Sequence, residues 1–535
     1  MSQKSVNGSY WQTPPGARNQ ILLIPISLEE RIPDDHPVRL LDEILDGLDW
    51  TAWESQYSGK LGQPPIHPSI LCKVLLFAMI RRVRSSRMIE YQIEHSVDFM
   101  WLVSGRSIDH STISDFRRQH KKELKDIHRQ MLRVAIDMGV AKLSVLCIDG
   151  TRVRANASRH KTWTADRVEK LLKELDGQIE TAMAELETND SINEMFDDGI
   201  SPAKLPPELA ELTTRREKMN EVLEQLQEMD RRRKADGINP KKKPAQLPKS
   251  DLDGRILPNK EGGYAPNFTP LAVNEMTNGF IVEADVLIGN VEHLNVITTV
   301  DTIRETYAVD IEALMADSAF ATGPNISELE ERGIEFLSPL SEVTCENNPA
   351  LRDDPTVPVA ADEVKRLPIN SQTKKFDRSA FVYDAASDCF HCPAGKTLSR
   401  GGQETRQTAA GPVLHVIYFG DECKGCELAP QCRKNPDAKN GRKVIRDEHE
   451  AARERHRARM NKPESADRYK QRQHFGEMPF AVMKVCFDMR RFLLRGLAGV
   501  QAEWQWCCTA FNLKKLMNLI AALRAEQRET AKNEI

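Results

Sequence analysis

The stretch Leu143-Ser-Val-Leu-Cys-Ile-Asp-Gly150 is a short apolar run that ends in an aspartate and a glycine. A run of this length predicts a buried strand, and α/β domains place their sites at the carboxyl ends of such strands. A second run, Ile311-Glu-Ala-Leu-Met-Ala316, ends in the same way at Asp317. The two runs therefore predict two strands that each end in an acidic residue, Asp149 and Asp317.

Further segments complete a predicted sheet around these two strands. Strand-like segments lie at 268–273, 280–288 and 334–337, and helix-like segments at 296–308 and 324–332. Two strands that can pair antiparallel, followed by strand–helix–strand alternation, predict a mixed sheet flanked by helices. The fold class expected from the sequence is α/β.

The residues before the sheet, 1–140, predict a helical domain. Pro68 suits the first turn of one helix, and Asp109 or Ser111 is expected to cap another. No recognition-helix pattern dominates, so a DNA-binding domain and a packing or dimerisation domain are both open.

Two insertions are expected to interrupt the sheet. The first, 164–255, has leucines at alternating three- and four-residue spacing followed by a basic linker, and it predicts a helical hairpin that is either a structural arm or a dimer- or DNA-clamping arm. The second, 341–465, holds a cluster of cysteines. The α/β domain then consists of 141–163, 256–340 and a helical C-terminal part, 466–525.

The cysteine cluster contains Cys389-x2-Cys392 and Cys423-x2-Cys426. Two such pairs resemble a zinc ribbon, in which each pair holds one tetrahedral ion from a turn. The sequence predicts a structural zinc ion at these four cysteines, with unliganded loop cysteines as the alternative. Cys432 is either an alternative ligand or a spectator.

Composition limits the function classes. The 535 residues carry a net charge of −4, but between Arg442 and Arg495 fifteen Lys/Arg face eight Asp/Glu, a local net charge of +7 that suits a polyanionic partner. No run approaches the roughly 18 apolar residues of a membrane span, and no Gly-rich phosphate loop is present. We expect a cytoplasmic protein with no membrane partner and no nucleotide cofactor.

A third acidic residue stands in the pattern Tyr469-x2-Arg472-x4-Glu477-x6-Lys484. On a helix, Glu477 and Lys484 are two turns apart and share a face. Two strand-end aspartates and a helical glutamate are the ligands that two-metal phosphodiester chemistry requires. Glu464 and Asp488 are the rival acids in this segment.

Each acid taken alone also has a structural interpretation. Asp149 precedes Gly150-Thr-Arg-Val-Arg154, which is expected to turn and place two guanidinium groups beside the carboxylate. Asp317 is compatible with a helix N-cap, and Glu477 with an exposed helical residue. Only the combination of the three favours a catalytic site.

The chain resembles DDE transposases of bacterial insertion sequences, from the group whose last acid lies in a Tyr/Arg/Glu/Lys signature. The resemblance spans about residues 36–520. Its motifs are His110-Ser-Thr-Ile-Ser114 with Phe116-Arg117, Ile148-Asp-Gly-Thr151, Ala316-Asp-Ser-Ala-Phe320, Glu477-Met-Pro-Phe480, Arg491-Phe-Leu-Leu-Arg-Gly496 and Phe511-Asn-Leu-Lys-Lys515.

The resemblance implies an RNase H-like catalytic domain with Asp149, Asp317 and Glu477 as ligands of Mg²⁺ or Mn²⁺. DNA contacts are implied at a set of polar and basic residues in the C-terminal part. One departure affects Arg472, because four residues rather than the signature's three separate it from Glu477. The implied DNA contacts are Tyr469, Arg472, Lys484, Arg491 and Arg495.

The implied activity is cleavage of DNA at the element's terminal inverted repeats and joining of the 3′-hydroxyl ends to target DNA. A homodimer is expected because two ends must be cut together, and the DNA-bound protein is expected in the nucleoid. Two alternatives are a transposase-derived DNA-binding protein without activity and a metal-dependent nuclease without strand transfer.

Overall fold

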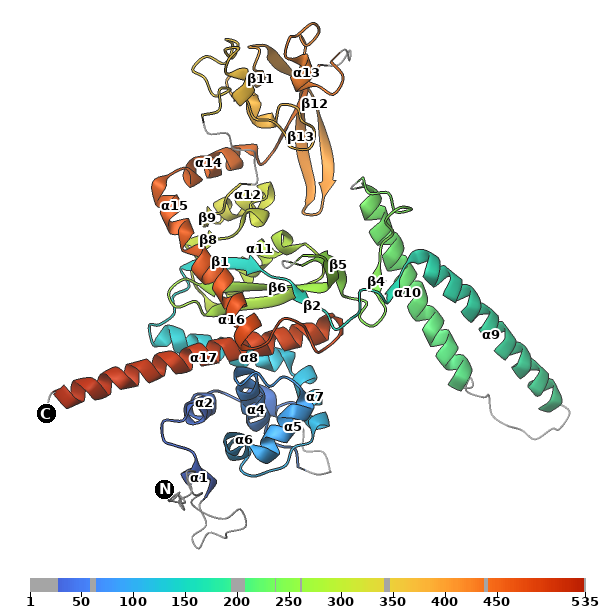
Figure 1. Ribbon diagram of the computed structural model, residues 1–535, viewed down its shortest axis with the longest axis vertical. Coiled ribbons are helices and arrows are strands. Elements are labelled where there is room, and N and C mark those ends of the chain that lie inside the picture. The colour runs from blue at the N-terminus through green and yellow to red at the C-terminus, as the bar shows by residue number, and fades with distance from the viewer. Residues whose placement is uncertain are drawn as a thin grey trace, which may run out of the picture. The chain divides into compact units, whose positions relative to one another are not determined.

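The predicted strands around Asp149 pair into one mixed sheet (Figure 1). The structure is a computed structural model, and the chain divides into two compact units, residues 1–119 with 520–535, and residues 120–519. The expected α/β class is confirmed, with both antiparallel and parallel strand pairs in the sheet. The residues described are 27–57, 64–193, 207–235, 237–259, 262–340, 347–436 and 441–533.

The sheet of the larger unit has the strand order β7-β6-β1-β8-β9. Strand β1 pairs antiparallel with β6 and parallel with β8, and β8 pairs parallel with β9. Two short strands, β2 and β5, also pair with β6. The strands are β1 (Val145–Gly150), β2 (Val153–Arg154), β5 (Arg255–Pro258), β6 (Tyr264–Glu275), β7 (Ile281–Leu287), β8 (Ala313–Met315) and β9 (Glu335–Leu337).

Strand β1 has neighbours on both edges, and its four inner residues are buried. A strand buried on both faces must be apolar along its whole length, which explains the continuous apolar run of the sequence. The helices of this unit are α8 (Lys121–Asp137), η1 (Glu292–Asn295), α11 (Val296–Tyr307), η2 (Ser318–Phe320), α12 (Gly323–Glu331), α14 (Glu450–Met460), α15 (Pro463–Lys470), η5 (Gln473–Glu477), α16 (Met478–Cys486) and α17 (Gly496–Asn533).

Helices are the only regular secondary structure in the described residues of the smaller unit. Helix α4 is buried on nearly all sides and begins at Pro68, as its position predicted, with His67 capping the backbone N–H of Ser69. Asp109 accepts the N–H of Ser111 at the start of α7. The helices are α1 (Leu28–Arg31), α2 (Pro37–Asp46), α3 (Thr51–Glu54), α4 (Pro68–Ile80), α5 (Ser86–His95), α6 (Val97–Leu102) and α7 (His110–Gln119), with the end of α17.

Helix α8 falls in the larger unit, although the predicted helical domain extended to residue 140. The reason is its buried face, where His128 hydrogen bonds through Nε2 to the carbonyl oxygen of Ile281 in β7, at 2.8 Å. A helix that follows a helical domain in sequence can pack on the sheet instead, and helix periodicity alone does not distinguish the two cases.

The first insertion is a pair of long helices, α9 (Ala165–Asn193) and α10 (Pro207–Ala235), drawn side by side in Figure 1. Their contact cluster includes Leu172, Leu175, Met219 and Leu226 of the predicted apolar seam. The segments that lead into and out of this helix pair form a two-stranded sheet, in which β3 (Thr162–Trp163) pairs with β4 (Leu247–Pro248). Other predicted positions, Leu186, Leu209, Pro202 and Pro206, lie outside the described side chains.

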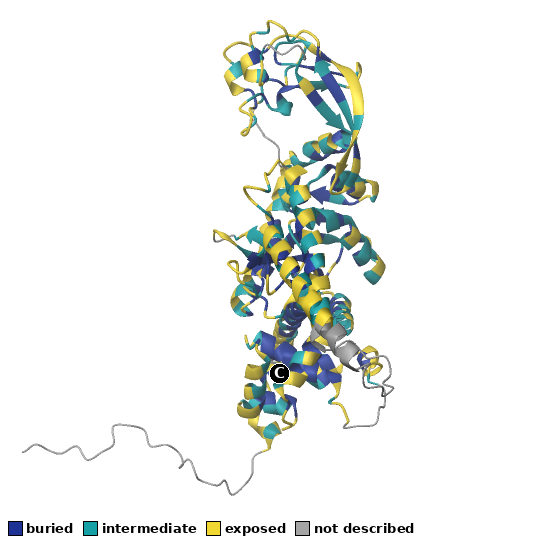
Figure 2. Ribbon diagram, turned by 90° about the vertical axis from the view of Figure 1, so that its right-hand side faces the viewer, coloured by how far each residue is buried: buried dark blue, intermediate teal, exposed yellow. Residues whose placement is uncertain are grey.

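The second insertion contains a five-stranded antiparallel sheet with its own apolar cluster, which includes Phe376, Phe390 and Tyr418. Strand β12 is mostly exposed along the ribbon it forms with β13 (Figure 2). The elements are η3 (Val364–Arg366), η4 (Arg378–Ala380), β10 (Val382–Asp384), β11 (Cys389–His391), β12 (Thr397–Thr408), β13 (Gly411–Gly420), α13 (Ala429–Cys432) and β14 (Lys443–Asp447).

A search of the described helices for a membrane span finds none that combines sufficient length with sufficient apolar character.

Candidate active site

Asp149 and Asp317 lie at the same edge of the sheet, as their positions after the two apolar runs predicted. Strands β1 and β8 are parallel neighbours whose last paired residues are Cys147 and Met315. Each aspartate lies two residues beyond this pair, so the register of the two strands brings the carboxylates to equivalent places. Asp149 is buried, with 5% of its surface exposed.

The two aspartates are held by different local bonds. Asp149 accepts the N–H of Gly150 through Oδ1 at 2.8 Å. Asp317 caps η2, because its Oδ1 accepts the N–H of Ala319 at 2.9 Å, and its main-chain oxygen accepts the Ser338 hydroxyl at 2.7 Å. The cap interpretation of Asp317 and its strand-end placement are therefore both correct, and the cap fixes the carboxylate's orientation.

Glu477 ends a single turn of π-helix, η5, that joins α15 to α16. A π-helical turn contains one more residue than an α-helical turn at the same place, so residues five apart come to share a face. Arg472 and Glu477 are five apart, and their side chains pair at 3.6 Å. The extra residue in the signature is thus absorbed by the π-helix.

Gly476 brings this turn directly against β1. A Cβ atom built on Gly476 would lie 3.0 Å from Cys147 Sγ and 3.5 Å from Asp149 Oδ2. Around this contact, Tyr469 and Phe475 pack against the apolar cluster of Cys147, Met315 and Leu337 at the strand ends. The C-terminal segment is therefore docked on the sheet edge that holds both aspartates.

Arg472 is the cation at the centre of the acidic group. Its Nη2 lies 3.2 Å from Asp149 Oδ2 and its Nη1 lies 3.6 Å from Glu477 Oε1, and its side chain is 10% exposed. Burial lowers the pKa of Arg472, but the charge of Asp149, followed by weaker contributions that include Asp317, raises the pKa above its usual value. One guanidinium thus interacts with all three acids.

The thiol of Cys147 gives a second measure of how the acids gather. Burial raises its pKa to about 12; Arg472 opposes this rise, and the charges of Asp149, Asp317 and Glu477 add to it. All three predicted acids therefore lie close enough to this residue of β1 to affect its thiol electrostatically. Of the three acids considered in the C-terminal segment, Glu477 is the one that pairs with Arg472 in the described structure, while the rival Glu464 is exposed in the first turn of α15.

The structure revises the environment expected for Asp149. The two arginines of the following turn were predicted to lie beside its carboxylate, but Arg152 pairs with Glu292 at 2.7 Å, and Arg154 lines a separate pocket. The arginine that pairs with Asp149 is Arg472, which lies more than 300 residues further along the chain.

The predicted DNA contacts fall into two groups. Tyr469 and Arg472 are turned toward the sheet and the acids, and Lys484 donates a hydrogen bond from Nζ to the Thr151 hydroxyl at 2.6 Å. Arg491 and Arg495 instead line a wide pocket of about 700 Å³ beside β2. We call this the basic pocket, and its cationic or titratable lining residues are Arg154, Arg159, His160, Lys161, Arg491 and Arg495.

The basic pocket forms where two distant segments of the chain run side by side. The segment after α16 runs beside β2, where Arg154 N–H donates to the Arg490 carbonyl at 3.1 Å and Phe492 N–H donates to the Arg154 carbonyl at 2.8 Å. Arg495 Nε then donates to the carbonyl of Asn156 at 3.2 Å. Arg159 and Lys161 were not predicted as contact residues, although the basic run Ser158-Arg-His-Lys161 is a signal for them.

The cysteines do not group as their spacing predicted. Cys392, Cys423 and Cys426 line one cavity together with Cys432, whereas Cys389 lies beside His391 and Asp384. Cys389 and Cys392 differ because the first is in strand β11, where successive side chains alternate between faces, and the second lies just beyond it.

Two family models of transposase domains match parts of the chain. The model of the "Transposase DDE domain" family matches residues 391–517, and that of "Transposase domain (DUF772)" matches residues 26–119. The first range contains Glu477 and Arg472, and neither contains Asp149 or Asp317. Among solved structures, a cryo-EM structure of a piggyBac transposase synaptic complex with hairpin DNA is 11% identical, with a TM-score of 0.31, over 91% of this chain and 75% of that chain. No curated protein matches.

The two family matches confirm the resemblance read from the motifs: the protein is a DNA transposase of the DDE type. It is of the insertion-sequence kind. As a DDE transposase it is an enzyme of the polynucleotidyl-transferase or nuclease class, with DNA as its partner and a dependence on divalent metal ions.

Proposed function

We propose that this transposase cleaves DNA at the ends of its insertion sequence and joins the 3′-hydroxyl ends to target DNA at a single site formed by Asp149, Asp317 and Glu477. The observation that carries the proposal is the ion-paired group of Asp149, Arg472 and Glu477, with Asp317 in matching register on the neighbouring strand. Two acids from distant parts of the sequence pair with one largely buried arginine, and charge clusters of this kind are typical of functional sites.

The proposal includes an RNase H-like catalytic domain. The sheet order β7-β6-β1-β8-β9 supports it, because the first three strands pair antiparallel and the last three pair parallel. The acids stand at the carboxyl ends of β1 and β8, the position where open α/β sheets hold their ligands.

The three carboxylates are proposed to hold Mg²⁺ or Mn²⁺. Carboxylate oxygens are the ligands that these hard cations prefer, and Arg472 already lies as a cation between two of them, so a positive charge is favoured at this place. When bound, two such ions would activate an attacking oxygen and stabilise a leaving one. We also propose one zinc ion in the cysteine-containing insertion. This ion would stabilise the fold of the insertion and take no part in the reaction.

The neighbouring side chains would position DNA around the acids. Lys484 is held by Thr151, two residues after Asp149, where its charge can attract a phosphate next to the scissile bond. The basic pocket offers several cationic side chains from β2 and the segment after α16, and it would bind the backbone further along the strand. We propose a homodimer acting in the nucleoid, because two element ends must be cut together.

The test uses the full-length protein and a supercoiled plasmid that carries the element with its ends. Asp317→Asn removes one carboxylate charge with little change of shape, and we expect nicking to fall to background while binding of end DNA in a gel-shift assay stays within a few-fold of wild type. Glu464→Gln is the matched control, since it removes one charge from the same unit at an exposed position. If Asp317→Asn retained full nicking, the assignment would be wrong.

Joining is measured separately, with pre-cleaved end DNA and a target plasmid. Strand transfer by wild type and its loss in Asp149→Asn and Glu477→Gln are the expected results. Cleavage without any joining would make the protein a nuclease, and binding without either reaction would make it an inactive transposase derivative.

A further inference from the structure

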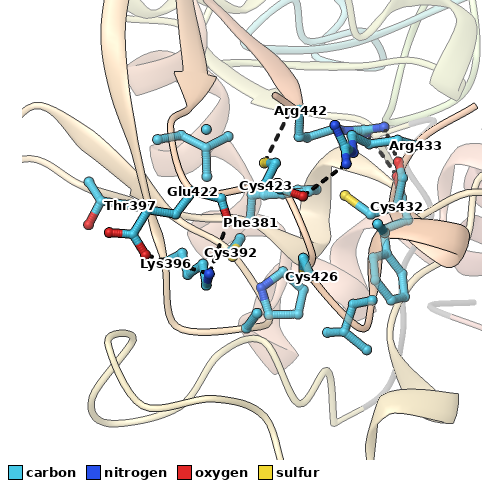
Figure 3. Close-up of a pocket in the computed structure, with 17 residues that line it drawn as sticks. Phe381, Cys392, Lys396, Thr397, Glu422, Cys423, Cys426, Cys432, Arg433 and Arg442 are labelled. Carbon is cyan, nitrogen blue, oxygen red and sulfur yellow. Dashed lines mark hydrogen bonds and ion pairs between the residues drawn. The ribbon is translucent and has the colours of Figure 1, made fainter. Parts of the chain in front are cut away.

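Four half-buried cysteines surround one small cavity in the second insertion (Figure 3). Cys392 follows β11, Cys423 and Cys426 lie in the loop after β13, and Cys432 ends α13. The cavity has a volume of about 30 Å³, and about 10–15 Å³ of such volume is enough for one water molecule. It therefore has room for one ion.

Two tight turns present the first three thiols to this cavity. In Cys392-Pro-Ala-Gly-Lys396, the Cys392 carbonyl accepts the Gly395 N–H at 2.9 Å, and the Lys396 carbonyl accepts the Cys392 N–H at 2.9 Å. Gly395 has a φ of +72°, and a Cβ there would lie 2.2 Å from the Thr356 oxygen, so only glycine fits. Gly425, inside Cys423-Lys-Gly-Cys426, has the same φ of +72°.

Backbone donors point at the sulfurs of these turns. The N–H groups of Ala394 and Lys396 hydrogen bond to the Cys392 sulfur, and the Arg442 N–H donates to Cys423 Sγ at 3.3 Å. Metal-bound sulfurs commonly accept such N–H···S bonds from the surrounding backbone. A thiol buried only for packing does not need them.

A cation stands beside the cluster. The Arg442 guanidinium donates through Nη1 to the Cys432 carbonyl at 2.8 Å and lies 5.2 Å from the centre of the Phe381 ring. A metal site with four thiolates carries excess negative charge around a divalent ion, and a fixed arginine offsets part of it. Arg442 is therefore placed where a four-thiolate site needs it.

We infer that Cys392, Cys423, Cys426 and Cys432 hold one structural zinc ion, and that Cys389 is not a ligand. Four cysteine sulfurs that line one cavity are the donor set of structural zinc. The ion would join the end of β11, the loop after β13 and helix α13, three parts of a small domain whose apolar cluster is modest. In domains of this size, a metal ion commonly supplies stability that the core lacks.

Zinc content of the full-length protein tests the inference. After dialysis against a weak chelator, we expect one zinc per chain in wild type and in Cys389→Ser, and loss of most zinc in Cys432→Ser. The two variants make the same chemical change at neighbouring places in one domain and are matched controls. Zinc retained by Cys432→Ser but lost from Cys389→Ser would overturn the assignment, as would a wild-type protein that binds no zinc after reconstitution.

A second measurement applies even if Cys432→Ser fails to fold. Wild-type protein is alkylated with and without added zinc, and the modified cysteines are mapped by mass spectrometry. We expect zinc to protect Cys392, Cys423, Cys426 and Cys432 together and to leave the labelling of Cys389 unchanged; protection of Cys389 in place of Cys432 would contradict the inference. Neither readout depends on DNA cleavage, so failure here is distinguishable from failure of the proposed reaction.

Discussion

A single methyl group at Gly476 is expected to disturb the proposed catalytic site. Gly476→Ala places a Cβ 3.0 Å from Cys147 Sγ and 3.5 Å from Asp149 Oδ2, so the π-helix and β1 must separate by a few tenths of an ångström. Overpacking of this kind costs typically about 1–3 kcal/mol, and alanine returns up to about 1 kcal/mol through its helix propensity. The net loss of stability is therefore at most about 3 kcal/mol.

The effect on the reaction is expected to be larger than the effect on stability. The methyl group separates the elements that carry Asp149 and Glu477, and a misplacement of about 1 Å can cost on the order of 100-fold in rate. For a shift of a few tenths of an ångström we expect plasmid nicking to slow by about 10-fold at saturating metal. Thermal unfolding of the same samples shows that the protein remains folded.

Two further variants make this expectation refutable. Gly177→Ala, in helix α9, adds a methyl group that meets nothing within 4 Å, and it should leave nicking unchanged while gaining up to about 1 kcal/mol in stability. Cys147→Ala removes the sulfur that the new methyl group meets, so the double variant should recover most of the nicking rate. A fully active Gly476→Ala, or a double variant as slow as Gly476→Ala, would refute the reasoning.

The basic pocket and the buried histidine give two more predictions. Arg159→Gln and Lys161→Gln should each weaken binding of end DNA and reduce the slope of log K against log salt by about 0.9. The control variant Arg304→Gln, on α11, should leave both the affinity and the slope unchanged. If all three variants had the same slope, phosphate contacts in the basic pocket would be excluded. Burial lowers the pKa of His128 to about 4, so the unfolded chain binds the proton more readily. The folded state should lose about 2 kcal/mol between pH 7 and pH 5 through this residue. His128→Gln should remove that share of the pH dependence of the urea midpoint, and an unchanged dependence would contradict the assignment.

The sequence predicted the sheet well because its signals are local. Strand β1 is buried on both faces, and its continuous apolar run shows this directly. The strand-end aspartates follow from the same runs, since the edge of a parallel pair is fixed once the two strands are recognised.

The contacts between distant segments could not be predicted in the same way. Spacing rules assume 3.6 residues per turn, so the five-residue separation of Arg472 and Glu477 gave no sign of a π-helix and left the role of Arg472 in doubt. In the structure Arg472 contacts the acids directly, which favours a role in holding the carboxylates over the DNA contact that was expected.

The cysteines show a similar limit. A CxxC pair presents two thiols to one ion only when it lies on a turn, and Cys389 lies instead in β11. Which of five neighbouring cysteines meet depends on strand pairing that the sequence does not encode locally.

The order of the segments along the chain also determines when the site can exist. Asp149 and Glu477 are separated by the two insertions and most of the sheet, and a ribosome adds roughly 5–20 residues per second. A new chain therefore carries its first aspartate for many seconds before the arginine and glutamate that complete the site are made. A chain cut short in either insertion contains the central strand but lacks Arg472 and Glu477, so on the proposed assignment it would not cut DNA.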